Sequence, residues 1–298
     1  MFLRACVIAS LIGLGGLCTN PAGDQILKMD QQSGRTTGTL RRGVVEVVAQ
    51  QRRRINKYGK HVLQPVAVVR VNGREVGRLS GAEWQTPASL VQIAEMDPSN
   101  PYPEVLLSSF TGGAHCCKQI QVLTSDRNGK NWREVKLGPF DGGPSPAEDP
   151  LRSGRFLIVS IDNRFLYRFA CYACSTAPAR IWALQGDAFV DVSHRPEFMP
   201  IHRRNLQRMA AWFQQKKPRS ANGFLAGYVA NKALVGEFAD GWARMLQRFE
   251  SSSDWDLTEC KGQLDFTGKC QGREIVYSSF PQALRAFLIE TGYIKSSD

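Results

Sequence analysis

Apolar and polar residues alternate with a period of two along much of the chain between residues 43 and 195. This is the period of a half-buried β-strand. The segment PVAVVRVNGREVGRLS carries two such runs on either side of Asn72-Gly73, a dipeptide that readily adopts the positive φ angles of a tight hairpin turn. Asn128-Gly129 separates two further runs in the same way. The pattern therefore predicts mainly antiparallel β structure that includes these two hairpins.

The strand pattern itself repeats. PEVLLSSFTGG followed by KQIQVLTSDRNGKNWREV has the same order of strand, link, strand, turn and strand as GRFLIVSIDNR followed by ARIWALQGDAFVDV. Corresponding residues, such as Val105 and Phe156, lie 51 positions apart, a period typical of blade-like sheet units. Residues 62–96 are a candidate third copy. Two or three copies are too few to close a propeller of about four to eight blades, so we expect an incomplete, propeller-blade-like β-repeat domain.

After Ser193 the apolar residues recur at spacings of three and four, which indicates amphipathic helices. RRNLQRMAAWFQQ and ANGFLAGYVANKALVGEFADGWARMLQRFE are predicted to be helical and to be separated by KKPRSANG. FPQALRAFLIETGY is predicted to be a further helix, with Pro281 in its first turn and Gly292 at its end. We interpret the aromatic and methionine stripes of these helices as core. The expected fold class is α+β, with a β-repeat domain at residues 43–195 followed by an α-helical domain at residues 196–298.

The amino-terminal residues carry a different pattern. Arg4 precedes an apolar run that ends at Cys18, which is the length of a secretory signal and too short to span a bilayer. We predict a signal peptide over residues 1–22 and a polar, flexible leader over residues 23–42. Lipidation at Cys18 is an alternative, but bulky Leu17 departs from the small residue expected before a lipoprotein cysteine. The protein is therefore predicted to be periplasmic or secreted, without a transmembrane helix.

Composition and charge narrow the range of partners. The chain is 43% hydrophobic and 22% charged, which is typical of a globular protein with a core rather than of a disordered one. A formal charge of +11 would suit nucleic acid, but export argues against that partner. The basic stretches QQRRRINKYGK and QQKKPR also lack the interleaved aromatic residues of a base-stacking surface. We interpret the basic stretches as a solvated surface. The partner is left open among an envelope protein, a glycan and an anionic envelope polymer, and nucleic acid is not expected.

Six cysteines follow the predicted signal peptide. An even number in an exported chain predicts disulfides, because such compartments are oxidising. The pairs Cys116-Cys117 and Cys171-x-x-Cys174 occupy the same place in the two β units. We favour bonds that join these two pairs and thereby link the units, and we leave open a vicinal Cys116–Cys117 bond and a local Cys171–Cys174 bond. Cys260 and Cys270 share one loop and are expected to pair with each other.

The run QIAEMDPSNPYPEVLLSSFTGGAHCC resembles a group of exported bacterial proteins of unknown function related to FG-GAP or VCBS-type β-propeller repeats. The resemblance covers residues 85–195 and is most specific at TGGAHCC, whose characteristic residues besides the cysteines are Thr111, Gly112, Gly113 and His115.

In FG-GAP repeats an Asp-rich loop binds Ca²⁺, and the resemblance implies Asp97, Asn100 and Glu104 as the surviving ligands of a degenerate loop. Prolines replace the glycines of that loop, and calcium takes about six to eight oxygen ligands. A rigid loop without calcium is therefore the favoured interpretation.

His115 and the four central cysteines also suggest a second class of chemistry. Soft ligands at short spacing suit zinc or copper, but oxidation in the envelope competes with metal binding. Cys171-x-x-Cys174 has the spacing of a redox pair, but such pairs usually begin a helix, whereas FACYACSTAP follows a strand and continues into Ser, Thr and Pro. No catalytic triad, carboxylate pair or phosphate-binding loop is evident, so no catalytic residue or cofactor is predicted. The sequence thus predicts an exported, non-enzymatic binding or scaffold protein stabilised by disulfides, and the alternative is a thiol-based metal-binding or redox protein.

Overall fold

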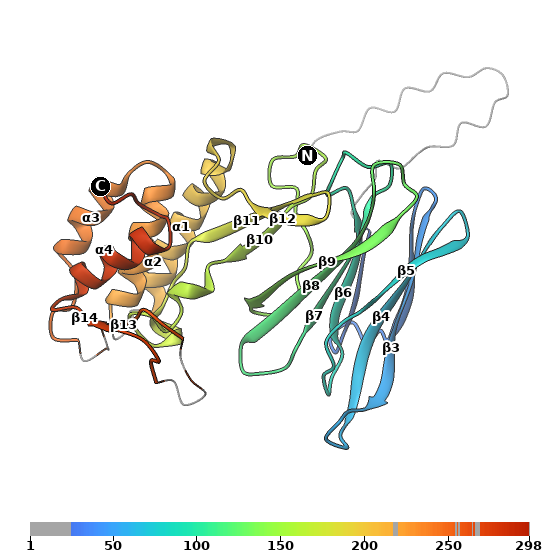
Figure 1. Ribbon diagram of the computed structural model, residues 1–298, viewed down its shortest axis with the longest axis horizontal. Helices are drawn as coiled ribbons and strands as arrows, with labels where there is room; N and C mark the ends of the chain where they lie inside the picture. The colour runs from blue at the N-terminus through green and yellow to red at the C-terminus, as the bar shows by residue number, and fades with distance from the viewer. Residues whose placement is uncertain are drawn as a thin grey trace, which may run out of the picture.

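In the computed structural model, the described residues are 25–216, 220–253, 255, 257–263, 265 and 269–297. The predicted signal peptide at residues 1–22 lies outside them. Figure 1 shows four layers along the long axis of the molecule: two antiparallel β-sheets, a smaller third sheet, and a group of helices at the carboxyl-terminal end. The chain is therefore α+β, with antiparallel sheets and a C-terminal helical region.

The first two sheets pack face to face. The four-stranded sheet has the order β2-β3-β4-β5, formed by Thr37–Arg42, Val45–Ile55, His61–Val71 and Arg74–Ser80. The five-stranded sheet has the order β1-β6-β7-β8-β9, formed by Gln25–Asp30, Ala88–Ala94, Glu104–Phe110, Cys116–Ser125 and Trp132–Asp141. Alternate residues of both sheets, including Val47, Val69, Val91 and Val105, form one core between them, as in a β-sandwich.

Both predicted hairpins are confirmed. Asn72 and Gly73 have φ angles of 50° and 79° between β4 and β5, the left-handed conformation that a two-residue turn requires. Asn128 and Gly129 lie in the turn between β8 and β9, where the Gly129 amide donates a hydrogen bond to the Asp126 carbonyl.

The predicted flexible leader at residues 23–42 is wrong for its described part. Strands β1 and β2 occupy most of residues 25–42, because β1 pairs with β6 and β2 pairs with β3. Leu27 and Met29 alternate into the sandwich core, and Met29 is fully buried. The segment looked polar because only one face of each strand is buried, and because the partner of β1, strand β6, lies far away in the sequence.

The third sheet covers the other face of the five-stranded sheet. It has the order β10-β11-β12, formed by Ile158–Ile161, Ala179–Gln185 and Ala188–Asp191. Ile158 and Leu184 pack against Leu106 and Ile120. The two units predicted from the repeat thus form β7-β8-β9 and β10-β11-β12, but the sheets close no propeller. Residues 62–96 do not form a third unit, since β4 and β5 belong to one sheet and β6 to another.

The helices are α1 (Met199–Lys216), α2 (Asn222–Leu234), α3 (Phe238–Leu246) and α4 (Phe280–Glu290). Gly236, with φ of 76°, separates α2 from α3 within the long apolar segment. Pro281 lies in the first turn of α4 and Gly292, with φ of 81°, follows its end, as predicted. Between α3 and α4 lies a short hairpin of β13 (Thr258–Cys260) and β14 (Glu274–Val276).

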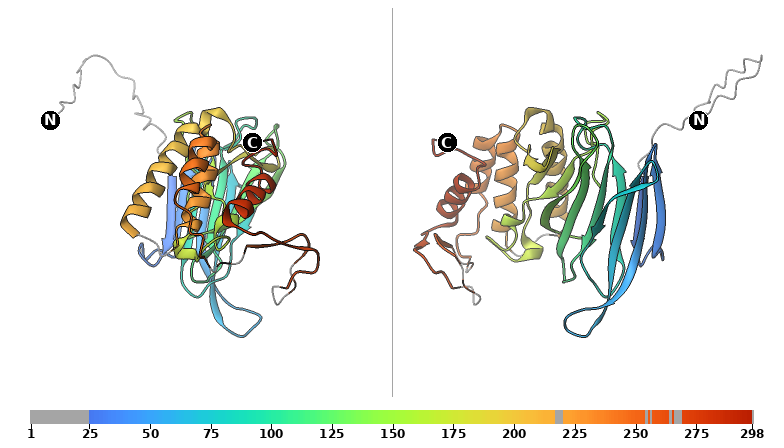
Figure 2. Two further views of the ribbon diagram at one scale, coloured as in Figure 1. Left: turned by 90° about the vertical axis from the view of Figure 1, so that its left-hand side faces the viewer. Right: turned by 45° about the vertical axis from the view of Figure 1, so that its right-hand side comes forward.

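The helical core also takes side chains from the segment that follows β10. Phe165, at the end of the 3₁₀ helix η1 (Asn163–Phe165), and Phe169 pack edge-on against Phe287 of α4. Figure 2 shows the helices stacked against the third sheet in two further orientations. No helix of the described residues is long and apolar enough to cross a membrane.

Candidate functional site

The first five residues of the TGGAHCC segment form the turn between β7 and β8, and its two cysteines begin β8. The Thr111 amide donates to the Cys117 carbonyl at 2.9 Å, and the Cys117 amide donates to the Thr111 hydroxyl at 3.1 Å. The Trp84 ring packs directly on Gly112: a Cβ there would lie 1.9 Å from the ring, and φ at Gly112 is +86°. Thr111 therefore closes the turn, and Gly112 lets Trp84 cover it.

His115, at the tip of this turn, joins a cluster of polar and aromatic side chains. Its Nδ1 lies 3.3 Å from Asp141 Oδ1 on β9, and its Nε2 lies 3.3 Å from the Tyr167 hydroxyl. The Tyr172 ring stacks on the imidazole with 3.7 Å between ring centroids, and its hydroxyl donates to Asp141 Oδ2 at 2.7 Å. Burial and this hydrogen bond raise the pKa of Tyr172 to about 12. The cluster fixes the imidazole and connects the turn to the segment that carries Cys171 and Cys174.

The six described cysteines form three local disulfides, Cys116–Cys117, Cys171–Cys174 and Cys260–Cys270. The favoured linkage between the two β units is therefore wrong, and the local alternative is observed. Cys171 precedes the 3₁₀ helix η2 (Tyr172–Cys174) and Cys174 ends it, and this single turn brings the two residues to a Cα distance of 5.1 Å. Among the described residues, no group of three or more His, Cys, Asp or Glu side chains is arranged to hold a metal ion.

Asp97, Asn100 and Glu104 lie together, as the resemblance to calcium loops implies, but protein donors occupy their oxygens. The buried Glu104 carboxylate accepts four hydrogen bonds: from the Met96 amide at 2.7 Å, the Asp97 amide at 3.1 Å, Asn100 Nδ2 at 2.6 Å and Thr124 Oγ1 at 2.9 Å. Burial outweighs these bonds and raises the pKa of Glu104 to about 7. The carboxylate therefore organises the loop from within.

Asp97 is also held by the protein. Its Oδ2 accepts from the Gly186 amide at 2.6 Å, and its Oδ1 accepts from the Ser99 amide at 3.1 Å. Burial opposes the charge, but these hydrogen bonds keep the pKa of Asp97 below its ordinary value. The loop is thereby attached to the turn between β11 and β12.

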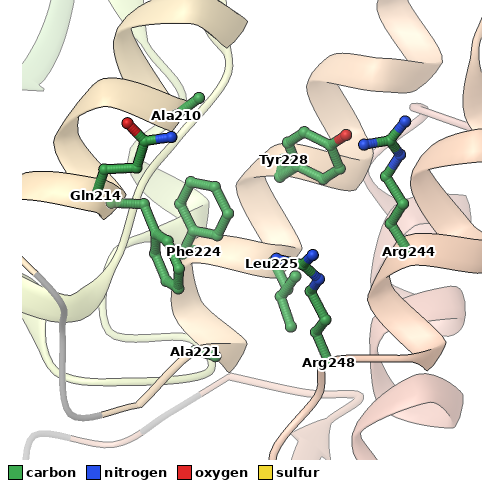
Figure 3. Close-up of a pocket in the computed structure, with 9 residues that line it drawn as sticks. Ala210, Gln214, Ala221, Phe224, Leu225, Tyr228, Arg244 and Arg248 are labelled. Atoms are coloured by element: carbon green, nitrogen blue, oxygen red, sulfur yellow. The ribbon is translucent and has the colours of Figure 1, made fainter.

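A cavity of 690 Å³ opens between α1, α2 and α3. Figure 3 shows Phe224 and Leu225 of α2 between Gln214 of α1 and the side chains of Arg244 and Arg248. The walls are mainly apolar and are contributed by Ala210, Phe213, Ala221, Phe224, Leu225 and Tyr228. A volume of this size is typical of a small-molecule site.

The charges at this cavity come from one end of α3. Arg244 Nε donates to Asp240 Oδ1 at 3.0 Å, and this hydrogen bond raises the pKa of Arg244. Arg248, two residues beyond α3, has no ion pair with any described acidic side chain. The cavity therefore combines an apolar interior with a basic edge.

Sequence reasoning missed this cavity because it assigned the aromatic stripes of the helices to the core. Phe224 does belong to the core, with only 8% of its surface exposed, but Phe213 and Tyr228 are only partly buried. Helical periodicity shows which face of a helix is apolar. It does not show that two apolar faces diverge and leave a space between them.

Residues 202–292, which include all the residues that line this cavity, match the family described as the sll0997 C-terminal domain. The chain is 48% identical over 234 residues to the "Probable thylakoid lumen protein sll0997" of Synechocystis, covering 78% of this chain and 68% of that protein. It is 34% identical over 208 residues to the "Uncharacterized protein y4bJ" of Sinorhizobium fredii, covering 68% of this chain but 32% of that protein. No solved structure matches. The extent of the first similarity shows that the chain belongs to the same family as Synechocystis sll0997.

Proposed function

We propose that the protein is an exported, non-enzymatic binding protein of the bacterial envelope that holds an apolar small molecule between α1, α2 and α3. The observation that carries the proposal is the 690 Å³ cavity, with aromatic and aliphatic walls and an open mouth. Transfer of apolar ligand surface from water onto such walls is favourable by roughly 25 cal/mol per Å². The proposed ligand thus binds chiefly by desolvation.

Two observations support the assignment to the envelope. The relative in Synechocystis is named "Probable thylakoid lumen protein", and the thylakoid lumen is a non-cytoplasmic compartment. All six described cysteines are in disulfides, which persist in oxidising compartments. The predicted signal peptide agrees with export.

The β part contributes the scaffold in this proposal. We assign residues 43–195, together with strands β1 and β2, to a β-repeat domain and residues 196–298 to a helical domain. The units β7-β8-β9 and β10-β11-β12 are proposed to be blade-like repeats related to FG-GAP units. Their shared order of three antiparallel strands supports this relation.

Filling the cavity tests the binding function. Ala210 and Ala211 are both exposed on α1, but only Ala210 lines the cavity. With 8-anilinonaphthalene-1-sulfonate as the probe, we expect Ala210→Trp to weaken binding at least tenfold, because the indole occupies the space that the probe needs. Ala211→Trp, the matched control, should bind as the unsubstituted protein does. The measurement is a fluorescence titration of the full mature chain.

Equal affinity of the two tryptophan variants would place the probe elsewhere and contradict the assignment. The same conclusion would follow if the unsubstituted protein showed no saturable binding. Circular dichroism of both variants shows whether α1 is retained, so a folding defect would not be mistaken for loss of the site.

A thiol-based function is the second candidate. The observation that favours it is the position of two disulfides, Cys116–Cys117 and Cys171–Cys174, beside the cluster of His115 and Tyr172. We expect disulfide mapping by mass spectrometry, on alkylated protein from the envelope, to find three intact bonds and no free thiol. Alkylated cysteines at these four positions, accompanied by zinc or copper, would support the metal-binding alternative instead.

A further inference from the structure

A second cavity lies at one end of the five-stranded and three-stranded sheets. Its volume is 510 Å³, and the loop before β7, the β8–β9 hairpin and the β11–β12 turn meet there. The side chains that matter are those of Asp97, Ser125, Arg127, Arg133, Arg155 and Gln185. Three arginines thus share one polar cavity outside the helical domain.

Arg155 is fixed by backbone carbonyls rather than by an acid. Its Nε donates to the Met96 carbonyl at 3.1 Å, and its Nη2 donates to the Leu184 carbonyl at 2.8 Å. These neutral partners hold the guanidinium at the cavity without cancelling its charge. Arg155 also ties the loop before β7 to the end of β11, so it has a structural part as well.

Arg127 lies in the β8–β9 turn, and Arg133 is the second residue of β9. Arg127 is exposed and has no ion pair with a described acidic side chain. Among the described acidic side chains, Arg133 approaches Asp187 at 3.9 Å, and the two side chains are 44% and 72% exposed. An exposed pair at this distance contributes little, roughly 0–1 kcal/mol. Both guanidinium groups are therefore available to a ligand.

The one acid that lines the cavity does not neutralise it. The Asp97 carboxylate accepts hydrogen bonds from the Gly186 and Ser99 amides, so its oxygens point into the protein's own backbone. Three arginines and one acid line the cavity. Two further acids lie nearby: Asp187, 3.9 Å from Arg133, and Glu95, which interacts electrostatically with both Arg42 and Arg155. The four arginines still outnumber the three acids, so the net charge is positive. The loop that resembles a calcium loop thus borders a cavity whose charge repels cations.

We propose that this cavity binds an oxyanion, a phosphate or sulfate group, through Arg127, Arg133 and Arg155. Guanidinium groups match the geometry of phosphate oxygens and bind them through paired, charge-assisted hydrogen bonds. The Gln185 side chain adds a neutral polar group. The volume leaves room for a carrier attached to the anion, such as a sugar or glycerol unit. The site is independent of the proposed apolar site between the helices.

The test is calorimetric titration of the full mature chain at constant ionic strength, with inorganic phosphate and glycerol 3-phosphate as separate probes. We expect binding of both, and at least a tenfold loss in the double variant Arg127→Gln/Arg133→Gln. Arg53→Gln/Arg74→Gln is the control. Both arginines are exposed and lie on the four-stranded sheet, away from the cavity, and their replacement lowers the net charge by the same two units as the test variant does. Arg155 is left intact because of its structural hydrogen bonds.

Tighter binding of glycerol 3-phosphate than of phosphate would support an anion presented on a larger molecule, and equal affinity would support the free anion. An equal loss of phosphate affinity in the control variant would show that general surface charge causes the effect, and it would overturn the proposal. Absence of binding by the unsubstituted protein would overturn it too. Ala210→Trp should leave phosphate binding unchanged, so failure here is distinguishable from failure of the apolar site.

Discussion

Replacing Glu104 with alanine is expected to destabilise the protein by about 4 kcal/mol. The substitution leaves four donors without their acceptor in a buried place: the amides of Met96 and Asp97, Asn100 Nδ2 and Thr124 Oγ1. Each unsatisfied buried donor costs roughly 1 kcal/mol or more. Urea unfolding of the variant and of the unsubstituted protein measures the difference.

The effect of pH provides a second, independent readout of Glu104. Because the pKa of Glu104 is raised to about 7 from an ordinary value of 4.5, the folded protein holds a proton that the unfolded chain releases between these values. The free energy of unfolding should therefore fall as the pH rises from about 4.5 to 7, by at most about 3 kcal/mol from this group. Above pH 7 its contribution should be constant.

The control variants separate these two effects. Glu104→Gln cannot titrate, so the difference in its pH profile from the unsubstituted protein isolates the ionisation of Glu104. Glu75→Ala removes an exposed carboxylate that pairs with Arg78 at 3.2 Å, and it should change stability by less than about 1 kcal/mol. A loss below 1 kcal/mol in Glu104→Ala would show that the carboxylate does not organise the loop as described.

Gly227→Ala is expected to destabilise the protein by about 3 kcal/mol, although alanine is the better helix former by about 1 kcal/mol. Helix α2 packs its backbone directly on Thr176, and a Cβ at residue 227 would lie 2.3 Å from the Thr176 carbonyl oxygen. That oxygen belongs to the backbone and cannot rotate away as a flexible side chain does. Helix and loop would have to separate.

A second close contact of α2 holds the loop that contains Cys171 and Cys174. One turn earlier on α2, a Cβ at Gly223 would lie 2.8 Å from the Cys174 carbonyl oxygen. Gly143→Ala is the control, because nothing lies within 4 Å of a Cβ at that position. Urea unfolding of both variants measures the effect. If Gly227→Ala were as stable as the unsubstituted protein, the close packing of α2 on this loop would be refuted.

Local sequence determined the elements whose conformation depends on neighbouring residues. The turns at Asn72-Gly73 and Asn128-Gly129 could be predicted because few residues adopt positive φ as readily as asparagine and glycine do, and Asn72, Gly73 and Gly129 have positive φ in the structure. Helix α4 could be predicted from Pro281 and Gly292 at its ends. Where the partner is remote, the same reasoning failed. Strand β1 is ordered by pairing with β6, some 60 positions later, and composition carries no trace of that pairing.

The sequence alone also identified the residues of the two loops, but not what they do. It grouped Asp97, Asn100 and Glu104, yet the donors that fill their oxygens come from segments as distant as Gly186. It identified an even number of cysteines and predicted disulfides. Which cysteines pair follows from the path of the backbone, which brings together residues that are near in the sequence. Both cavities arise where separate elements converge or diverge. Pattern and spacing describe the chain along its length, and only tertiary packing decides which charges and apolar faces meet across it.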